Sequence, residues 1–103
     1  MRHFHRTSLH PDAVLRVADG FFPTIGMRPS AEGPRTRTYR GVVGTPEVQA
    51  TLELSVRMEG GHYTFVETDS DQMGESRLDH NVKKFFVLLY QQVHAGHTFA
   101  PSY

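Results

Sequence analysis

The sequence contains no cysteine in its 103 residues. Without cysteine there is no disulfide, thiolate zinc site, iron–sulfur cluster or cysteine nucleophile. Long apolar runs are missing as well, since the run Phe85 to Tyr90 is far shorter than the roughly 20 residues that a membrane-spanning helix requires. The first residues, MRHFHRTSLH, lack the apolar core of a signal peptide. We therefore expect a cytoplasmic protein without a membrane span.

An excess of charge of one sign is also missing, because 11 Lys and Arg balance 11 Asp and Glu. A neutral chain offers no electrostatic footprint for nucleic acid or anionic lipid. Arg37, Tyr39 and Arg40 do interleave basic and aromatic residues, but strand alternation sends the two arginines to opposite faces. The 7 histidines would add positive charge only on acidification. These features argue against a nucleic-acid partner.

Motifs that carry catalytic chemistry are absent. The chain has no G-x-S-x-G, P-loop or G-x-G-x-x-G. The pairs His3-x-His5 and His94-x-x-His97 each supply two nitrogens, whereas zinc sites use three or four protein ligands. The sequence therefore predicts no metal site, no cofactor and no catalytic residue, which is the pattern of a protein that is not an enzyme.

The sequence does contain a regular succession of elements. HFHRTSL alternates like a short edge strand, and an apolar stripe that follows Pro11 predicts a helix over 11–22. Glycine and proline without apolar periodicity predict a flexible loop over 26–36. Further strands are expected at about 36–43, 48–58 and 62–69, and a long helix then leads to a C-terminal tail at 96–103.

The turn Gly60-Gly61 sets the expected pairing of the last two strands. If these glycines form a two-residue turn, Val56 pairs with Phe65 and Leu54 with Glu67. One sheet face is then polar and wet, so both helices must cover the other. We predict an α+β two-layer sandwich within one domain of residues 1–103. Its antiparallel sheet of about four strands follows the order β-α-β-β-β-α, with both helices on one face.

This register points the charged side chains of Arg37 and Glu67 inward, on either side of Leu54. They could hold a polar group of a ligand, or they could lie at strand ends that the helices leave uncovered. A buried ion pair costs several kcal/mol per ion unless it is well hydrogen-bonded, so an inward pair would need a reason. The candidate ligand cavity is lined by Arg37, Tyr39, Leu52, Leu54, Phe65, Glu67 and Phe86.

The last helix offers a second candidate surface. At 100° per residue, Leu78, Phe85 and Leu89 fall in one core stripe, whereas Val87 lies on the polar back and Leu88 on a flank. Exposed apolar side chains that cluster mark interaction sites. The candidate docking patch for a protein partner is Val87, Leu88, Phe99 and Tyr103.

A family resemblance rests on the N-terminal pattern S-x-x-P-D-x-V-x-x-x-A-D. It is formed by Ser8, Pro11, Asp12, Val14, Ala18 and Asp19. Together with the following sheet and the long last helix, it resembles the helix-grip fold of polyketide cyclase-like and START-like lipid-binding proteins. The resemblance implies a helix that lies across a curved sheet, with a cavity for an apolar ligand between them. This chain is shorter and lacks two strands, which implies a smaller cavity, and no catalytic residue of the family maps onto it.

Two functions remain open from the sequence. The first is a small non-catalytic interaction module, an accessory or regulatory subunit that docks on a larger assembly or on copies of itself. The alternative is a carrier of a small apolar ligand, held in a helix-grip-like cavity between the sheet and the C-terminal helix.

Overall fold

The computed structural model describes residues 1–43, 48–72 and 77–98. The elements are β1 (Arg2–Thr7), α1 (Pro11–Phe21), the 3-10 helix η1 (Phe22–Ile25), β2 (Met27–Glu32), β3 (Thr36–Val43), β4 (Val48–Glu59), β5 (Tyr63–Ser70) and α2 (Arg77–Thr98). Among the described helices, none is both long enough and apolar enough to cross a membrane.

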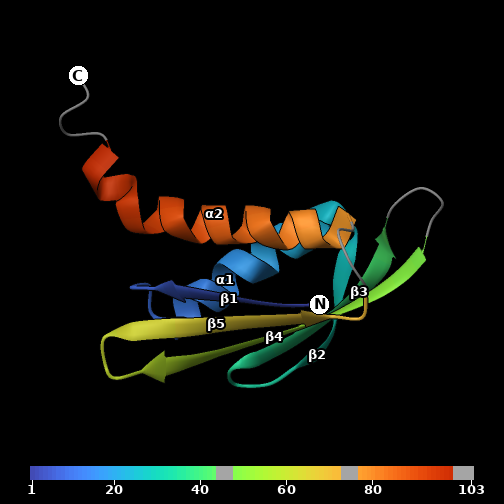
Figure 1. The fold of residues 1–103 in the computed structure, drawn as a ribbon, viewed down its shortest axis with the longest axis horizontal. Helices are drawn as coiled ribbons and strands as arrows, with labels where there is room; N and C mark the ends of the chain where they lie inside the picture. Colours follow the sequence, from blue (N-terminus) through green and yellow to red (C-terminus); the bar gives the residue numbers. More distant parts are fainter. Residues whose placement is uncertain (44–47, 73–76, 99–103) are drawn as a thin grey trace.

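The strands form one antiparallel sheet of 5 strands in the order β1-β5-β4-β3-β2. Both α-helices lie on one side of it, with α2 running across the layer (Figure 1). We call the side of the sheet under the helices the inner face and the opposite side the outer face. The predicted two-layer α+β sandwich is confirmed, with five strands in place of about four.

The additional strand, β2 (Met27–Glu32), occupies the segment for which a flexible loop was expected. It pairs with β3, and the register shifts between Pro29 and Ala31. Proline has no amide hydrogen, and it is tolerated in strands at edges and bulges. The bulge also interrupts the two-residue alternation, so the sequence shows no strand pattern there.

Close contact between β2 and β3 depends on Gly41. A Cβ atom at this position would overlap the carbonyl oxygen of Gly26, which is backbone and cannot rotate away. We expect Gly41→Ala to lower the free energy of unfolding by about 1–3 kcal/mol, measured by urea denaturation. Gly20→Ala is the control: a Cβ atom there meets nothing within 4 Å, so this helical change should be neutral or stabilising. Equal stability of the two variants would contradict this account.

The turn between β4 and β5 is longer by one residue than the sequence suggested. Glu59 pairs with Tyr63 across a loop of Gly60, Gly61 and His62, and the His62 amide donates to the Glu59 carbonyl over 3.3 Å. Both glycines have positive φ, 62° and 75°. The glycine pair is compatible with either loop length, so it could not decide between them. The predicted two-residue turn is wrong.

A register shift of one residue sends every side chain of β5 to the other face. Thr64, Val66 and Thr68 therefore face the helices, and Phe65 and Glu67 face away from them. The apolar row of β4 lies on the inner face as predicted, and Leu52 and Leu54 are buried there.

Aromatic rings fill the layer between sheet and helices. Phe85 of α2 lies 5.1 Å from Phe22, and Phe22 lies 4.8 Å from Tyr39 of β3, measured between ring centroids. All three residues are 0% exposed. The predicted stripe of α2 is buried against them, and the helix continues to Thr98, so 96–98 are helical rather than part of a tail.

Candidate functional site

A row of side chains crosses the inner face of the sheet from β3 to β1. Arg37 pairs with Leu54, Leu54 with Thr68, and Thr68 with His3. Residues that pair across antiparallel strands share a face. The row therefore places three polar side chains, those of Arg37, Thr68 and His3, under the two helices.

At the β3 end of the row, α1 supplies the carboxylate of Asp19. The Tyr39 hydroxyl donates to it over 2.7 Å, and Arg37 Nε donates to its two oxygens over 3.1 and 3.3 Å. Burial, helped by the bond to Asp19, raises the pKa of Tyr39 far above its ordinary value of 10.0, so the hydroxyl stays protonated. Asp19, and not Glu67, thus meets the charge of Arg37.

At the β1 end, α2 supplies a second carboxylate, Asp79, whose side chain is 5% exposed. His3 Nε2 hydrogen-bonds Oδ1 of Asp79, and Lys83 Nζ lies 3.3 Å from Oδ2. Burial alone would raise the pKa of Asp79, but the bonds from His3 and Lys83 outweigh it and hold this pKa below its ordinary value. An imidazole oriented by a carboxylate is the arrangement that proteins use for general acid–base chemistry.

Between these ends lies a hydroxyl for which the described residues provide no partner. Thr68 is 0% exposed, and its Oγ1 makes no hydrogen bond among the described residues. Buried hydroxyls are usually satisfied, and an unsatisfied one costs about 1–3 kcal/mol. Because Thr68 stands opposite His3 on the neighbouring strand, the hydroxyl and the imidazole lie side by side on the inner face of the sheet.

The structure divides the predicted ligand-lining residues between the two faces. Arg37, Tyr39, Leu52 and Leu54 lie on the inner face, and Phe86 of α2 stacks on His5 with 5.0 Å between ring centroids. The remaining residues, Phe65 and Glu67, lie on the outer face because of the corrected register. Glu67 pairs there with Arg2, at 3.4 Å.

The predicted docking patch is described only in part. Val87 is 53% exposed and Leu88 is half-buried, as their positions on the helix suggested. Phe99 and Tyr103 lie outside the described residues. One turn of α2 past Phe86, Tyr90 is 58% exposed.

The outer face carries a hollow of about 360 Å³. It is lined by Arg2, Thr36, Arg37, Thr38, Glu53, Leu54, Ser55, Glu67 and Asp69. Small-molecule pockets are lined mainly by apolar and aromatic side chains. The polar lining makes this hollow a weak candidate for an apolar ligand.

Sequence reasoning missed the row as a site. His3 was considered only as a metal ligand. Nothing in the local sequence connects His3 and Asp79 with Thr68, because the three residues meet only through strand pairing and the packing of α2 on the sheet. Within residues 1–43, 48–72 and 77–98, no three His, Asp or Glu side chains come together as metal ligands.

Comparisons with known proteins agree with the fold. No family model matches the chain, and no curated protein matches it in sequence. Among solved structures it is similar to the crystal structure of the di-domain ARO/CYC StfQ from the steffimycin biosynthetic pathway, with a TM-score of 0.59 and 9% identity. The similarity covers 94% of this chain and 46% of that one, so this chain spans about half of that protein's length.

The structural neighbour corrects one expectation and supports another. The chain was expected not to be an enzyme, yet a solved protein with a similar fold is an aromatase/cyclase, so the expectation drawn from missing motifs does not stand. The resemblance to the helix-grip fold is supported at the level of the fold. The chain shares its fold with about half of this di-domain ARO/CYC structure, at 9% sequence identity.

Proposed function

We propose that this domain binds a small, largely apolar molecule that carries an oxygen atom, in the space between its sheet and α2. The observation that carries the proposal is the unsatisfied Oγ1 of Thr68, which lies inside this layer beside His3. A hydroxyl or carbonyl group of a ligand would supply the hydrogen-bond partner that the described residues do not. The shared fold supports the proposal, because the structural neighbour, the ARO/CYC StfQ, comes from the steffimycin biosynthetic pathway.

The surroundings of Thr68 favour an apolar molecule with one polar end. Leu54 and Val66 flank it on the inner face, and Leu78 and Val82 of α2 are buried in the same core. Such a lining, with a few polar groups that fix orientation, is typical of small-molecule sites. His3, oriented by Asp79, would be the group able to give or take a proton at the polar end of the ligand.

Entry of a ligand requires α2 to move away from the sheet, because the layer is closely packed. The helix is held there by its apolar stripe and, at its first turn, by Asp79. A ligand that binds only the open arrangement would shift the population towards it. Binding should therefore perturb the α2 residues that face Thr68 as well as Thr68 itself.

Thr68→Val tests this proposal, because valine has nearly the same shape without the hydroxyl. We expect the free energy of unfolding to rise by about 1–3 kcal/mol in the absence of ligand. With 1-naphthol as the probe, followed by NMR titration, we expect weaker binding by about 0.5–1.5 kcal/mol, the contribution of one hydrogen bond.

Thr51→Val is the matched control, since Thr51 lies on the outer face and is only half-buried. Thr51→Val should change neither the free energy of unfolding nor the binding of 1-naphthol appreciably. A Thr68→Val protein that is less stable than the parent would mean that the hydroxyl is already satisfied. That result, together with unchanged naphthol binding, would remove the proposed function.

We also propose that the side of α2 that faces away from the sheet binds a protein partner. The exposure of Val87, at 53%, favours this second proposal. The partner would be a larger assembly or another copy of the chain, with Leu88, Phe99 and Tyr103 completing the patch. Val87→Glu should leave the fold intact and abolish a complex seen by native mass spectrometry of the protein from its own cell. A complex that survives this change would exclude the patch.

A further inference from the structure

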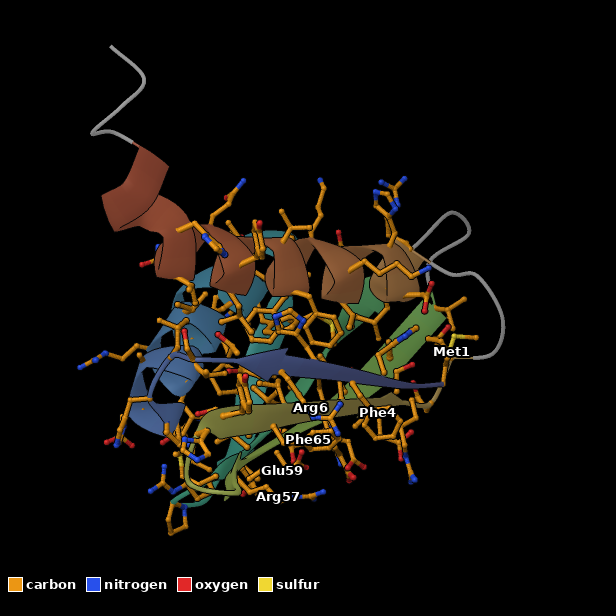
Figure 2. The ribbon with its side chains drawn as sticks, turned by 60° about the vertical axis from the view of Figure 1, so that its left-hand side comes forward. Met1, Phe4, Arg6, Arg57, Glu59 and Phe65 are labelled. Atoms are coloured by element: carbon orange, nitrogen blue, oxygen red, sulfur yellow. The ribbon has the colours of Figure 1, made fainter. Side chains whose placement is uncertain are left out.

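Charges on the outer face are matched at the end of the sheet near the turn between β4 and β5. Arg6 Nε donates to Glu59 over 2.8 Å, and the Arg57 guanidinium lies 4.5 Å from the centroid of the Phe65 ring. Figure 2 shows these four residues together on the side of the sheet away from α2. Each guanidinium at this end therefore has a partner within the protein, either a carboxylate or an aromatic face.

Towards the other end of the outer face, like charges stand directly opposite one another. Arg28 of β2 pairs with Arg40 of β3, and Glu53 of β4 pairs with Asp69 of β5. Like charges at directly opposite positions are destabilising. Asp69 has a partner in Arg2, at 3.5 Å. Arg28, Arg40 and Glu53 are exposed and form no ion pair with the residues that the structure describes, so these three charges are open to a ligand.

The basic pair and the acidic pair lie in neighbouring rows of the sheet. Thr51 stands opposite Arg40, and Glu53 lies two residues further along β4 on the same face. Two residues of an antiparallel strand span about 6.8 Å, so opposite charges are presented at roughly this spacing. Long side chains can reach a diagonal neighbour, yet Arg40 and Glu53 form no ion pair with each other.

The outer face is hollowed along both rows. A hollow of about 390 Å³ lies beside Arg40 and is also lined by Val42, Gln49 and Thr51. A second hollow, of about 220 Å³, is lined by Thr51 and Glu53 among others. Because Thr51 borders both hollows, a small molecule that lies across this residue can reach the basic row with one end and the acidic row with the other.

We propose that the outer face of β3 and β4 binds a small zwitterion, with its anionic group at Arg28 and Arg40 and its ammonium group at Glu53. A phosphate monoester carries about −1.5 to −2 charges at pH 7, which balances two guanidiniums better than one carboxylate does. Guanidinium groups also bind phosphate through paired N–H donors. The ligand class is therefore an aminoalkyl phosphate whose charged groups are about 7 Å apart.

The probe for this proposal is 3-aminopropyl phosphate, followed at low salt through the NMR amide signals of residues 38–42 and 49–53. Propyl phosphate, which lacks the ammonium group, and 3-aminopropanol, which lacks the phosphate, are the matched control ligands. We expect the zwitterion to bind about two- to fivefold more tightly than propyl phosphate, which is the contribution of one exposed ion pair. 3-Aminopropanol should cause no measurable shift.

Variants of the protein separate the two ends of the site. R28Q/R40Q should weaken the binding of both phosphates by about tenfold or more, because it removes the charged hydrogen-bond donors. E53Q should retain the phosphate and lose the preference for the ligand that carries the ammonium group. Lys84→Gln is the control, since it removes an exposed positive charge from α2, on the other side of the sheet, and should bind like the parent.

Four results would overturn the proposal. Failure of 3-aminopropyl phosphate to shift the signals of 38–42 and 49–53 would remove the site altogether. Equal binding of the two phosphates by the parent would reduce it to a plain anion site. Unchanged binding by R28Q/R40Q would remove the phosphate from the arginines, and a preference that survives in E53Q would remove the ammonium group from Glu53.

Discussion

Phe85→Ala is expected to lower the free energy of unfolding by about 3–5 kcal/mol. The ring is 0% exposed and contacts Phe22 at 5.1 Å and Phe21 at 6.3 Å between centroids, so it joins α2 to α1 and η1. Alanine would leave a cavity at the point where both helices meet the sheet. Since small domains are stable by only about 5–15 kcal/mol, the loss should be visible directly in urea denaturation followed by circular dichroism.

Val87→Ala provides the control on the same helix. Val87 is 53% exposed, so its truncation should change stability by no more than about 0.5 kcal/mol. If Phe85→Ala does not fold at all, Phe85→Leu should still fold and lose less than about 1.5 kcal/mol. A Phe85→Ala protein as stable as the Val87→Ala protein would contradict the placement of α2 on the sheet.

The sequence predicted those features in which one element repeats a single pattern. The helical period separated Phe85, in the core, from Val87, in solvent, although both lie in one apolar run. Strict alternation likewise identified the buried side of β4. In these elements each side chain's position depends on its neighbours along the chain, so the pattern can be read locally.

Features that depend on how elements meet were not predictable in the same way. The pair Gly60-Gly61 fits turns of either length, and only the packed sheet shows that Phe65 faces outward. The strand Met27–Glu32 forms because it pairs with β3, and its bulge interrupts the alternation of side chains that would identify a strand in the sequence. The row from Arg37 to His3 is formed only by pairing across several strands, so no sequence motif identifies it.

Asp19 and Asp79, the two carboxylates that contact the row, lie on helices that the sequence predicted. The residues that they contact were not predicted. Asp19 was read as part of a family pattern, and in the structure it meets Arg37 and Tyr39. The inward charge of Arg37 on β3, for which the sequence analysis considered a ligand, is therefore met by Asp19 within the protein. The unexplained polar group is Thr68, an uncharged residue that drew no attention in the sequence.

Asp79→Asn is expected to lower the free energy of unfolding at pH 7 by about 2–3 kcal/mol. The change removes the charge from hydrogen bonds to His3 and Lys83, and hydrogen bonds to charged groups contribute about 1.5–3 kcal/mol each. Because Asp79 is 4% exposed, solvent cannot replace these partners fully. The measurement is urea denaturation of both proteins across a range of pH.

The pH dependence identifies the origin of this loss. The pKa of Asp79 in the folded protein lies below its ordinary value of 3.8, so its contribution is complete above that value and disappears as the pH falls through the folded pKa. The difference between parent and Asp79→Asn should therefore shrink in acid. Asp69→Asn, which alters an exposed pair with Arg2 at 3.5 Å, should cost less than about 1 kcal/mol at pH 7. A difference for Asp79→Asn that persists unchanged in acid would show that it arises from packing and not from the charge of Asp79.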